Sequence, residues 1–236
     1  MISAMSLEIP VAGVVLQADV NLPESAQGVV LFAHGSGSGR YSPRNRYVAS
    51  ELNGAGLATV LVDLLTAQEE RIDARTYELR FDIDLLSERL AALTDWLARD
   101  ERTAELGVGL FGASTGAAAA LVTAAMRPNL VQAVVSRGGR PDLAGKFLRL
   151  VRAPTLLIVG EQDPTVIELN RKAMSEMSTT TQLVIVPRAT HLFEEPGTLE
   201  QVAGLAREWF VRYLRRVPRS NTDSLDGAPE RTKPHG

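Results

Sequence analysis

The sequence predicts an α/β domain built on a mostly parallel sheet, and two observations support this fold class. Short apolar runs of strand length alternate with longer stretches of helical periodicity, a pattern typical of parallel strands joined by crossover helices. The chain has 236 residues, 45% of them hydrophobic and 22% charged, which suits a globular domain with a large core. An α/β chain of this length commonly forms one domain. We therefore expect one domain over residues 1–216, with helices on both faces of its sheet.

The strands are predicted first, from a short hairpin signal and six apolar runs. Residues 7–20, with a turn signal near Gly13, predict an antiparallel hairpin at the edge of the sheet. The apolar runs are continuous rather than alternating, as in parallel strands covered on both faces. They occupy residues 29–33, 58–62, 108–111, 131–135, 155–159 and 183–186.

The helices are predicted between these strands, at residues 47–52, 83–97, 115–125, 167–177 and 199–214. In the segment 83–97, leucine or isoleucine recurs every three or four residues, which gives one apolar stripe facing the sheet. Residues 136–154 are too few for a separate lid domain, so we expect an open pocket. Residues 217–236 are rich in proline, glycine and charge, and are expected to form a disordered tail.

Composition excludes several classes of function. With 25 Lys and Arg against 28 Asp and Glu, the net charge is −3, and no long basic run offers a nucleic-acid surface. The chain has no cysteine, which excludes disulfides, thiolate metal sites and a cysteine nucleophile. The first residues lack the pattern of a signal peptide, and no apolar run approaches the ~20 residues of a membrane-spanning helix. We expect a cytoplasmic protein with no nucleic-acid or membrane partner, while a homo-oligomer remains possible.

The segment 107–120 carries the strongest chemical signal. A buried strand runs into Gly112-Ala-Ser114-Thr-Gly116 and then into a helix, which is a G-x-S-x-G turn in a strand–turn–helix context. Small flanking residues let strand and helix approach while the serine takes a strained backbone conformation. The same segment also fits G-x-G-x-x-G at residues 107–112, but these glycines lie inside the strand and no strand-end acid follows about twenty residues later. We therefore expect no dinucleotide cofactor.

A serine hydroxyl needs a base, and the chain has three histidines. His235 lies in the expected tail and His34 in a glycine loop, so His191, after the last strand, is the candidate base. An orienting carboxylate is expected between Ser114 and His191 in chain order, at a strand end, and Asp163 fits, with Glu161 as the alternative.

Each of these residues alone also has a structural explanation. Ser114 could cap a helix, Asp163 could open one, and His191 could be an ordinary loop residue. All three together, in this order and each after its own strand, favour a catalytic set.

The glycine loop after the first central strand is the candidate oxyanion hole. Its sequence from His34 is H-G-S-G-S-G, and glycines leave backbone N–H groups uncovered. We expect one N–H from Ser36 and one from Thr115, the residue after the candidate nucleophile. An ordinary flexible surface loop is the alternative.

Taken together, the motifs H-G-S-G-S-G, G-A-S-T-G, G-E-Q-D-P and A-T-H-L-F give the chain, over residues 29–214, a resemblance to the α/β-hydrolase family. It looks most like the dienelactone hydrolase-like members. The resemblance implies the α/β-hydrolase fold, with Ser114, Asp163 and His191 as nucleophile, orienting acid and general base, and Ser36 and Thr115 as oxyanion donors. Dienelactone hydrolases proper use cysteine, whereas this chain has serine, which favours general ester hydrolysis. Similar domains also occur joined to phosphoribosyltransferase domains, but no phosphoribosyl-binding acidic motif is present here.

The expected activity is hydrolysis of small carboxylic esters or lactones through an acyl-enzyme, with no metal or cofactor. Candidate substrate-binding residues are His34, Gly35, Arg137 and Arg140. The two arginines follow a strand at its carboxyl end, where they could bind a substrate carboxylate or could be solvated loop charges. Acyl transfer or thioester hydrolysis on the same triad, and a non-catalytic binding protein with this fold, are the alternative functions.

Overall fold

The computed structural model describes residues 2–35 and 37–217. Its centre is one eight-stranded sheet in the order β1-β2-β4-β3-β5-β6-β7-β8. The strands are β1 (Ile2–Val11), β2 (Val14–Pro23), β3 (Gly28–Ala33), β4 (Ala58–Val62), β5 (Gly107–Ala113), β6 (Val131–Arg137), β7 (Thr155–Gly160) and β8 (Thr181–Val186).

The parallel part of the sheet runs from β4 to β8, and the first two strands form the predicted hairpin. Strands β1 and β2 pair antiparallel, and β2 pairs antiparallel with β4. The turn between them has positive φ at Ala12 (49°) and Gly13 (75°), which matches the right-handed twist of a tight hairpin. The predicted mixed sheet is thus confirmed. One detail was wrong: β8 is only partly buried, because it is an edge strand with a neighbour on one side.

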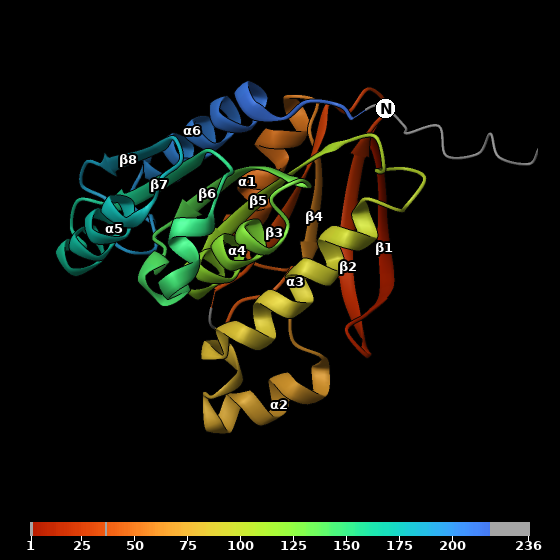
Figure 1. Cartoon of the computed structure of the whole chain (residues 1–236), viewed down its shortest axis with the longest axis horizontal. Helices are drawn as coiled ribbons and strands as arrows, with labels where there is room; N and C mark the ends of the chain where they lie inside the picture. Colours follow the sequence, from red (N-terminus) through yellow and green to blue (C-terminus); the bar gives the residue numbers. More distant parts are fainter. Residues whose placement is uncertain (1, 36, 218–236) are drawn as a thin grey trace, which may run out of the picture.

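Helices cover both faces of the sheet (Figure 1). One face carries α3 (Ile83–Leu97), α4 (Thr115–Met126), α5 (Pro164–Glu176) and the 3₁₀ segment η2 (Pro141–Leu150). The other face carries α1 (Pro43–Gly54) and α6 (Thr198–Tyr213). In α3 the predicted stripe is confirmed, since Leu86, Leu90, Leu93 and Leu97 are all buried. The five predicted helices are therefore present, with ends shifted by a few residues.

The sequence analysis missed α2 (Ala67–Thr76) and the short 3₁₀ turn η1 (Leu79–Phe81). Helix α2 buries only Asp73, so it has no apolar stripe for periodicity to detect. The available signal was the capping box that opens it, Thr66 followed three residues later by Glu69. In Figure 1 this helix lies beyond α3, away from the sheet.

The end of the chain is only partly described. The Val217 N–H donates a backbone hydrogen bond to Glu105 O at 2.8 Å, which holds the last described residue against the segment before β5. The predicted tail from residue 218 to 236 lies outside the described residues. Within the described ranges, none of the helices combines the length and the apolar character that crossing a membrane requires.

Candidate active site

The G-x-S-x-G segment forms a sharp turn between β5 and α4. Ser114 has φ 51° and ψ −121°, a conformation that costs a non-glycine residue about 1–3 kcal/mol. The flanking glycines are needed because the backbones are in contact. A Cβ on Gly112 would lie 2.4 Å from Ala117 Cα, and one on Gly116 would lie 2.2 Å from Ala33 O. The close packing of β3, β5 and α4 therefore holds the serine in its strained position.

Backbone hydrogen bonds tie Ser114 to the neighbouring strand. Its N–H donates to Arg137 O at 3.2 Å, which continues the pairing of β5 with β6 by one residue. Its carbonyl accepts from Ala117 N and Arg140 N, both at 3.1 Å. The position of Ser114 is thus fixed by strand pairing on one side and by the first turn of α4 on the other.

Asp163 and His191 come together at the carboxyl ends of β7 and β8. Asp163 immediately precedes α5, and His191 lies in the loop after β8. The His191 Nδ1–H donates to Asp163 Oδ2 at 2.6 Å. The aspartate side chain is 16% exposed and the histidine side chain 40%. The alternative acid, Glu161, instead accepts from Arg188 N at 2.7 Å.

The serine and histidine segments meet at Gly138. This residue follows Arg137, whose carbonyl binds the Ser114 N–H. A Cβ added to Gly138 would lie 3.1 Å from His191 O and 3.6 Å from His191 Cε1. Gly138 therefore lies between the end of β6, which accepts the Ser114 N–H, and the loop that carries the His191 imidazole. On the other side of the serine, a Cβ on Gly35 would lie 2.9 Å from Ser114 Cβ, so the glycine loop also reaches Ser114.

His34 organises the glycine loop. It is buried, its Nδ1–H donates to Gly35 O at 3.0 Å, and its Nε2 accepts from Leu64 N at 2.9 Å. Burial lowers the pKa of His34, which keeps the imidazole neutral in this arrangement. Both ring nitrogens of His34 are thus hydrogen-bonded to backbone groups. The imidazole links the loop after β3, at Gly35, to the segment after β4, at Leu64. Ser36 lies outside the described residues, and Thr115 is the buried first residue of α4.

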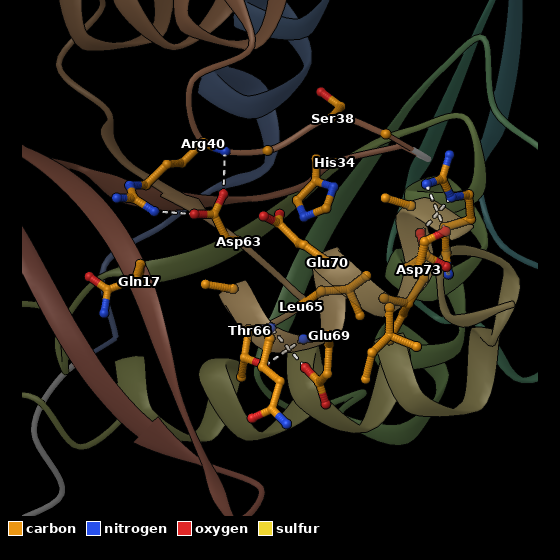
Figure 2. A pocket seen from close by; sticks show the side chains of 18 of the residues that line it. Gln17, His34, Ser38, Arg40, Asp63, Leu65, Thr66, Glu69, Glu70 and Asp73 are labelled. Atoms are coloured by element: carbon orange, nitrogen blue, oxygen red, sulfur yellow. Dashed lines mark hydrogen bonds and ion pairs between the residues drawn. The ribbon is translucent and has the colours of Figure 1, made fainter. Parts of the chain in front are cut away.

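A cavity of about 1150 Å³ opens beside the serine. His34, Gly35 and Thr115 line it next to Ser114, and the start of β2, the loop 37–41 and α2 form its other walls. Figure 2 shows these walls, with His34 and Asp63 on one side and the residues of α2 on the other. The missed helix α2 is therefore a wall of the candidate substrate pocket.

Charged side chains in this pocket are mostly paired. Asp63 accepts from Arg40 N at 2.7 Å and from the Arg40 guanidinium, and Arg80 Nε donates to Asp73 Oδ2 at 2.5 Å. Burial alone would raise the pKa of Asp73, but the hydrogen bonds from Arg80 together lower it. Sequence reasoning missed these pairs because their members lie seven or more residues apart and meet only in the folded chain.

Glu69 also holds α2, which forms this wall of the pocket, in place. It receives two hydrogen bonds from the buried Arg89 guanidinium, at 2.6 and 2.8 Å, and closes the capping box with Thr66. The hydrogen bonds from Arg89 lower the pKa of Glu69 to about 2.

The two arginines singled out at the end of β6 have different environments. Arg140 is paired with Asp142 through two hydrogen bonds of 2.8 Å. Arg137 is only 8% exposed and does not line the cavity, so it is not the solvated loop charge considered above. Among residues 2–35 and 37–217, no three His, Asp or Glu side chains group closely enough to hold a metal ion.

Comparison with known proteins gives matches over nearly the whole chain. A crystal structure of dienelactone hydrolase from Anabaena variabilis superposes with a TM-score of 0.89 at 59% identity, covering 91% of this chain and 99% of that one. Est1E from Butyrivibrio proteoclasticus has the same fold, with a TM-score of 0.73 at 16% identity over 88% of this chain and 98% of that one.

Two curated Mycobacterium tuberculosis proteins, from different strains and both provisionally named phosphoribosyl transferases, are 59% identical over 206 residues. The match covers 87% of this chain but only 44% of each relative, so the chain spans less than half of their length. The model of the Dienelactone hydrolase family matches residues 16–214. The chain therefore belongs to the dienelactone hydrolase family of α/β-hydrolases.

Proposed function

We propose that this protein is a serine hydrolase that cleaves small carboxylic esters or lactones. The observation that carries the proposal is the 2.6 Å hydrogen bond between His191 Nδ1 and Asp163 Oδ2. It lies at the carboxyl ends of the parallel strands, where Ser114 occupies a strained turn. A histidine that donates from Nδ1 to a carboxylate keeps its lone pair on Nε2, which is the form a general base requires.

In the proposed reaction, Ser114 Oγ attacks the ester carbonyl carbon while His191 Nε2 takes the hydroxyl proton. Asp163 stabilises the imidazolium that forms. The tetrahedral oxyanion accepts hydrogen bonds from the backbone N–H groups of Ser36 and Thr115, and each such donor typically contributes a factor of ~10²–10³ in rate. The histidine then gives its proton to the leaving alcohol. Water attacks the acyl-enzyme by the same route and releases the carboxylic acid and free Ser114.

The lining of the cavity bears on the kind of substrate. Its mixed wall of Val14, Leu65 and Ile72 with charged neighbours suits an acyl or alcohol group with some polar character, and its volume of about 1150 Å³ is ample for a small ester. A solved structure of Est1E, which shares the fold, has ferulic acid bound, so esters of small aromatic acids belong in a substrate screen. We also propose that residues 1–216 act as one catalytic domain.

Acyl transfer and thioester hydrolysis use the same triad, and the acceptor distinguishes them. The transferase name of the mycobacterial relatives is not extended to this chain, because the match leaves more than half of each relative uncovered.

The test is a panel of p-nitrophenyl esters, lactones and acyl thioesters, with and without an alcohol acceptor, assayed on the wild type and on Ser114→Ala. We expect hydrolysis of short acyl esters by the wild type and a loss of at least ~10⁴-fold in Ser114→Ala. Product analysis that finds mainly the transferred ester would favour an acyltransferase. Equal activity of the wild type and a folded Ser114→Ala would contradict the proposal.

A further inference from the structure

The two buried arginines of the described chain differ in their partners. Arg89, 3% exposed, is neutralised by Glu69 and also donates to Leu64 O. Arg137, 8% exposed, has its Nε and Nη1 buried without any hydrogen-bond partner. A buried guanidinium without an anionic partner is unfavourable, since charges removed from water are normally paired. Arg137 therefore needs an explanation that Arg89 does not.

The group that acts most directly on Arg137 by charge is another cation. Burial, and then the positive charge of Arg44, lower the pKa of Arg137 to about 10, so the guanidinium still carries its charge at neutral pH. Arg44 is itself bound to Glu194 through a 2.8 Å ion pair, and its Nε is also buried without a partner. Two positive charges and one carboxylate leave one net positive charge in this cluster.

The fold brings a helix N-terminus to the same place. Arg137 is the last residue of β6, and its side chain projects to the same face as Val135, the face of the sheet that carries α1 and α6. Arg44 lies in the first turn of α1, whose N-terminus is capped by Ser42 and contains no acidic residue. Pro43 has no N–H, and the amides of Asn45 and Arg46 donate to Ser42, so the first turn offers an anion the Arg44 N–H and the positive end of the helix dipole. The Arg137 guanidinium without an anionic partner, the unpartnered Nε of Arg44 and the helix dipole thus point to the same ligand chemistry.

We propose that Arg137, Arg44 and the first turn of α1 form a binding site for one small anion, of the size of chloride or a carboxylate group. The anion supplies the charge that the protein itself does not place beside Arg137. This site is separate from the cavity next to α2, because neither Arg137 nor Arg44 lines that cavity. It is nevertheless adjacent to the candidate catalytic residues, since Arg137 O binds Ser114 N–H and Gly138 contacts the His191 loop.

An anion bound here stabilises the native state by mass action. It therefore raises the melting temperature of the protein in a saturable way, and it does so whether or not the protein hydrolyses an ester. The same site could be filled by free anion or by the carboxylate of a bound substrate, and these two sources differ in their kinetics.

The experiment measures the melting temperature in chloride, acetate and phosphate, against the bulky sulfonate MES at equal ionic strength. For the wild type we expect a saturable rise of about 3 °C in at least one of the small anions relative to MES. Arg137→Met should melt higher than the wild type in MES, because it removes the unpartnered charge, and should lose the anion response. Arg127→Gln, which breaks a distant pair with Asp95, is the matched control and should keep the response.

Arg44→Gln serves as the second variant and is expected to weaken the anion response at least five-fold in apparent affinity. If Arg137→Met does not fold, this variant decides the question. The proposal is overturned if the wild type melts at the same temperature in all four anions. It is also overturned if Arg137→Met, or Arg44→Gln where the former is insoluble, responds as Arg127→Gln does.

Kinetics distinguish the two sources of the anion. If substrate carboxylate fills the site, chloride should raise KM for a p-nitrophenyl ester with a free carboxylate and leave KM for p-nitrophenyl acetate unchanged. If free anion fills it, both substrates should respond alike. Absence of any hydrolysis would count against the proposed function, while the melting-temperature result would still test the anion site.

Discussion

The turn that carries Ser114 and the segment around α2 are held in place by different forces. Strand β5 is buried along its whole length, and α4 packs its alanines and leucine into the core. Helix α2 buries only one side chain and is fixed by a capping box and by the ion pairs of Arg80 and Arg89. Packing without free space defines the position of Ser114, whereas a few polar contacts define the wall of the pocket. The first region should therefore tolerate almost no change, and the second should tolerate change at a moderate cost.

The largest effect is expected at Gly116. In Gly116→Ala, the new Cβ would lie 2.2 Å from Ala33 O and 2.5 Å from His34 O, and both are backbone atoms that cannot turn away. We expect the free energy of unfolding to fall by about 3 kcal/mol or more, and ester hydrolysis to be lost, because β3 and α4 must separate. Urea denaturation and an ester assay measure both.

Gly204→Ala is the matched control for this change. Gly204 lies in α6 and an added Cβ would meet nothing within 4 Å, so the substitution should stabilise the helix by up to ~1 kcal/mol. If Gly116→Ala were as stable as the wild type, the description of the turn as fully packed would be wrong.

An intermediate effect is expected at the base of α2. Glu69→Gln removes the carboxylate that neutralises buried Arg89 and closes the capping box. Breaking a fully buried pair costs about 3–5 kcal/mol; since the Glu69 side chain is 25% exposed, we expect about 2 kcal/mol here. Arg171→Gln, which breaks an exposed pair with Glu168, should change stability by less than ~0.5 kcal/mol. Equal losses in both variants, measured in urea, would contradict this difference.

The pH dependence of this contact follows from the lowered pKa of Glu69. Because the folded-state pKa is about 2 and the usual value is 4.5, the carboxylate contributes stability above pH 4.5 and loses it as the pH falls toward 2. The stability difference between the wild type and Glu69→Gln should therefore be constant at neutral pH and shrink through this window. A difference that stays constant down to pH 2 would show that the charge of Glu69 is not responsible.

The smallest effect is expected at Glu70, on the pocket side of the same helix. Its carboxyl points toward His34 and Asp63 (Figure 2), and desolvation and the charge of Asp63 raise its pKa. Glu70→Gln should leave stability unchanged and raise KM about two-fold for a cationic choline ester, with no change for a neutral ester of equal size, since exposed charges interact weakly. Equal changes of KM for both esters would show that Glu70 acts by shape rather than charge.

The same contrast explains what the sequence could predict. The turn at Ser114 follows from the spacing of its glycines, and the buried stripe of α3 follows from leucines at helical intervals. Both features depend on residues close together in the sequence, so both could be predicted from it. Helix α2 could not be found by periodicity, because its stability comes from Glu69 and Asp73 binding arginines elsewhere in the fold. The burial of Arg137 was missed for a related reason: an arginine at a strand end is usually exposed, and only the tertiary packing on this face of the sheet covers it.

The most direct test of the central claim is reaction with a fluorophosphonate probe, read by mass spectrometry of the intact protein and its peptides. If Ser114 is the activated nucleophile, the folded wild type should gain one adduct, located on the peptide that contains Ser114. Ser114→Ala should gain none, and His191→Ala should react at least ~10²-fold more slowly. A folded wild type that stays unlabelled, or an adduct on a different residue that persists in Ser114→Ala, would contradict the assignment of this serine.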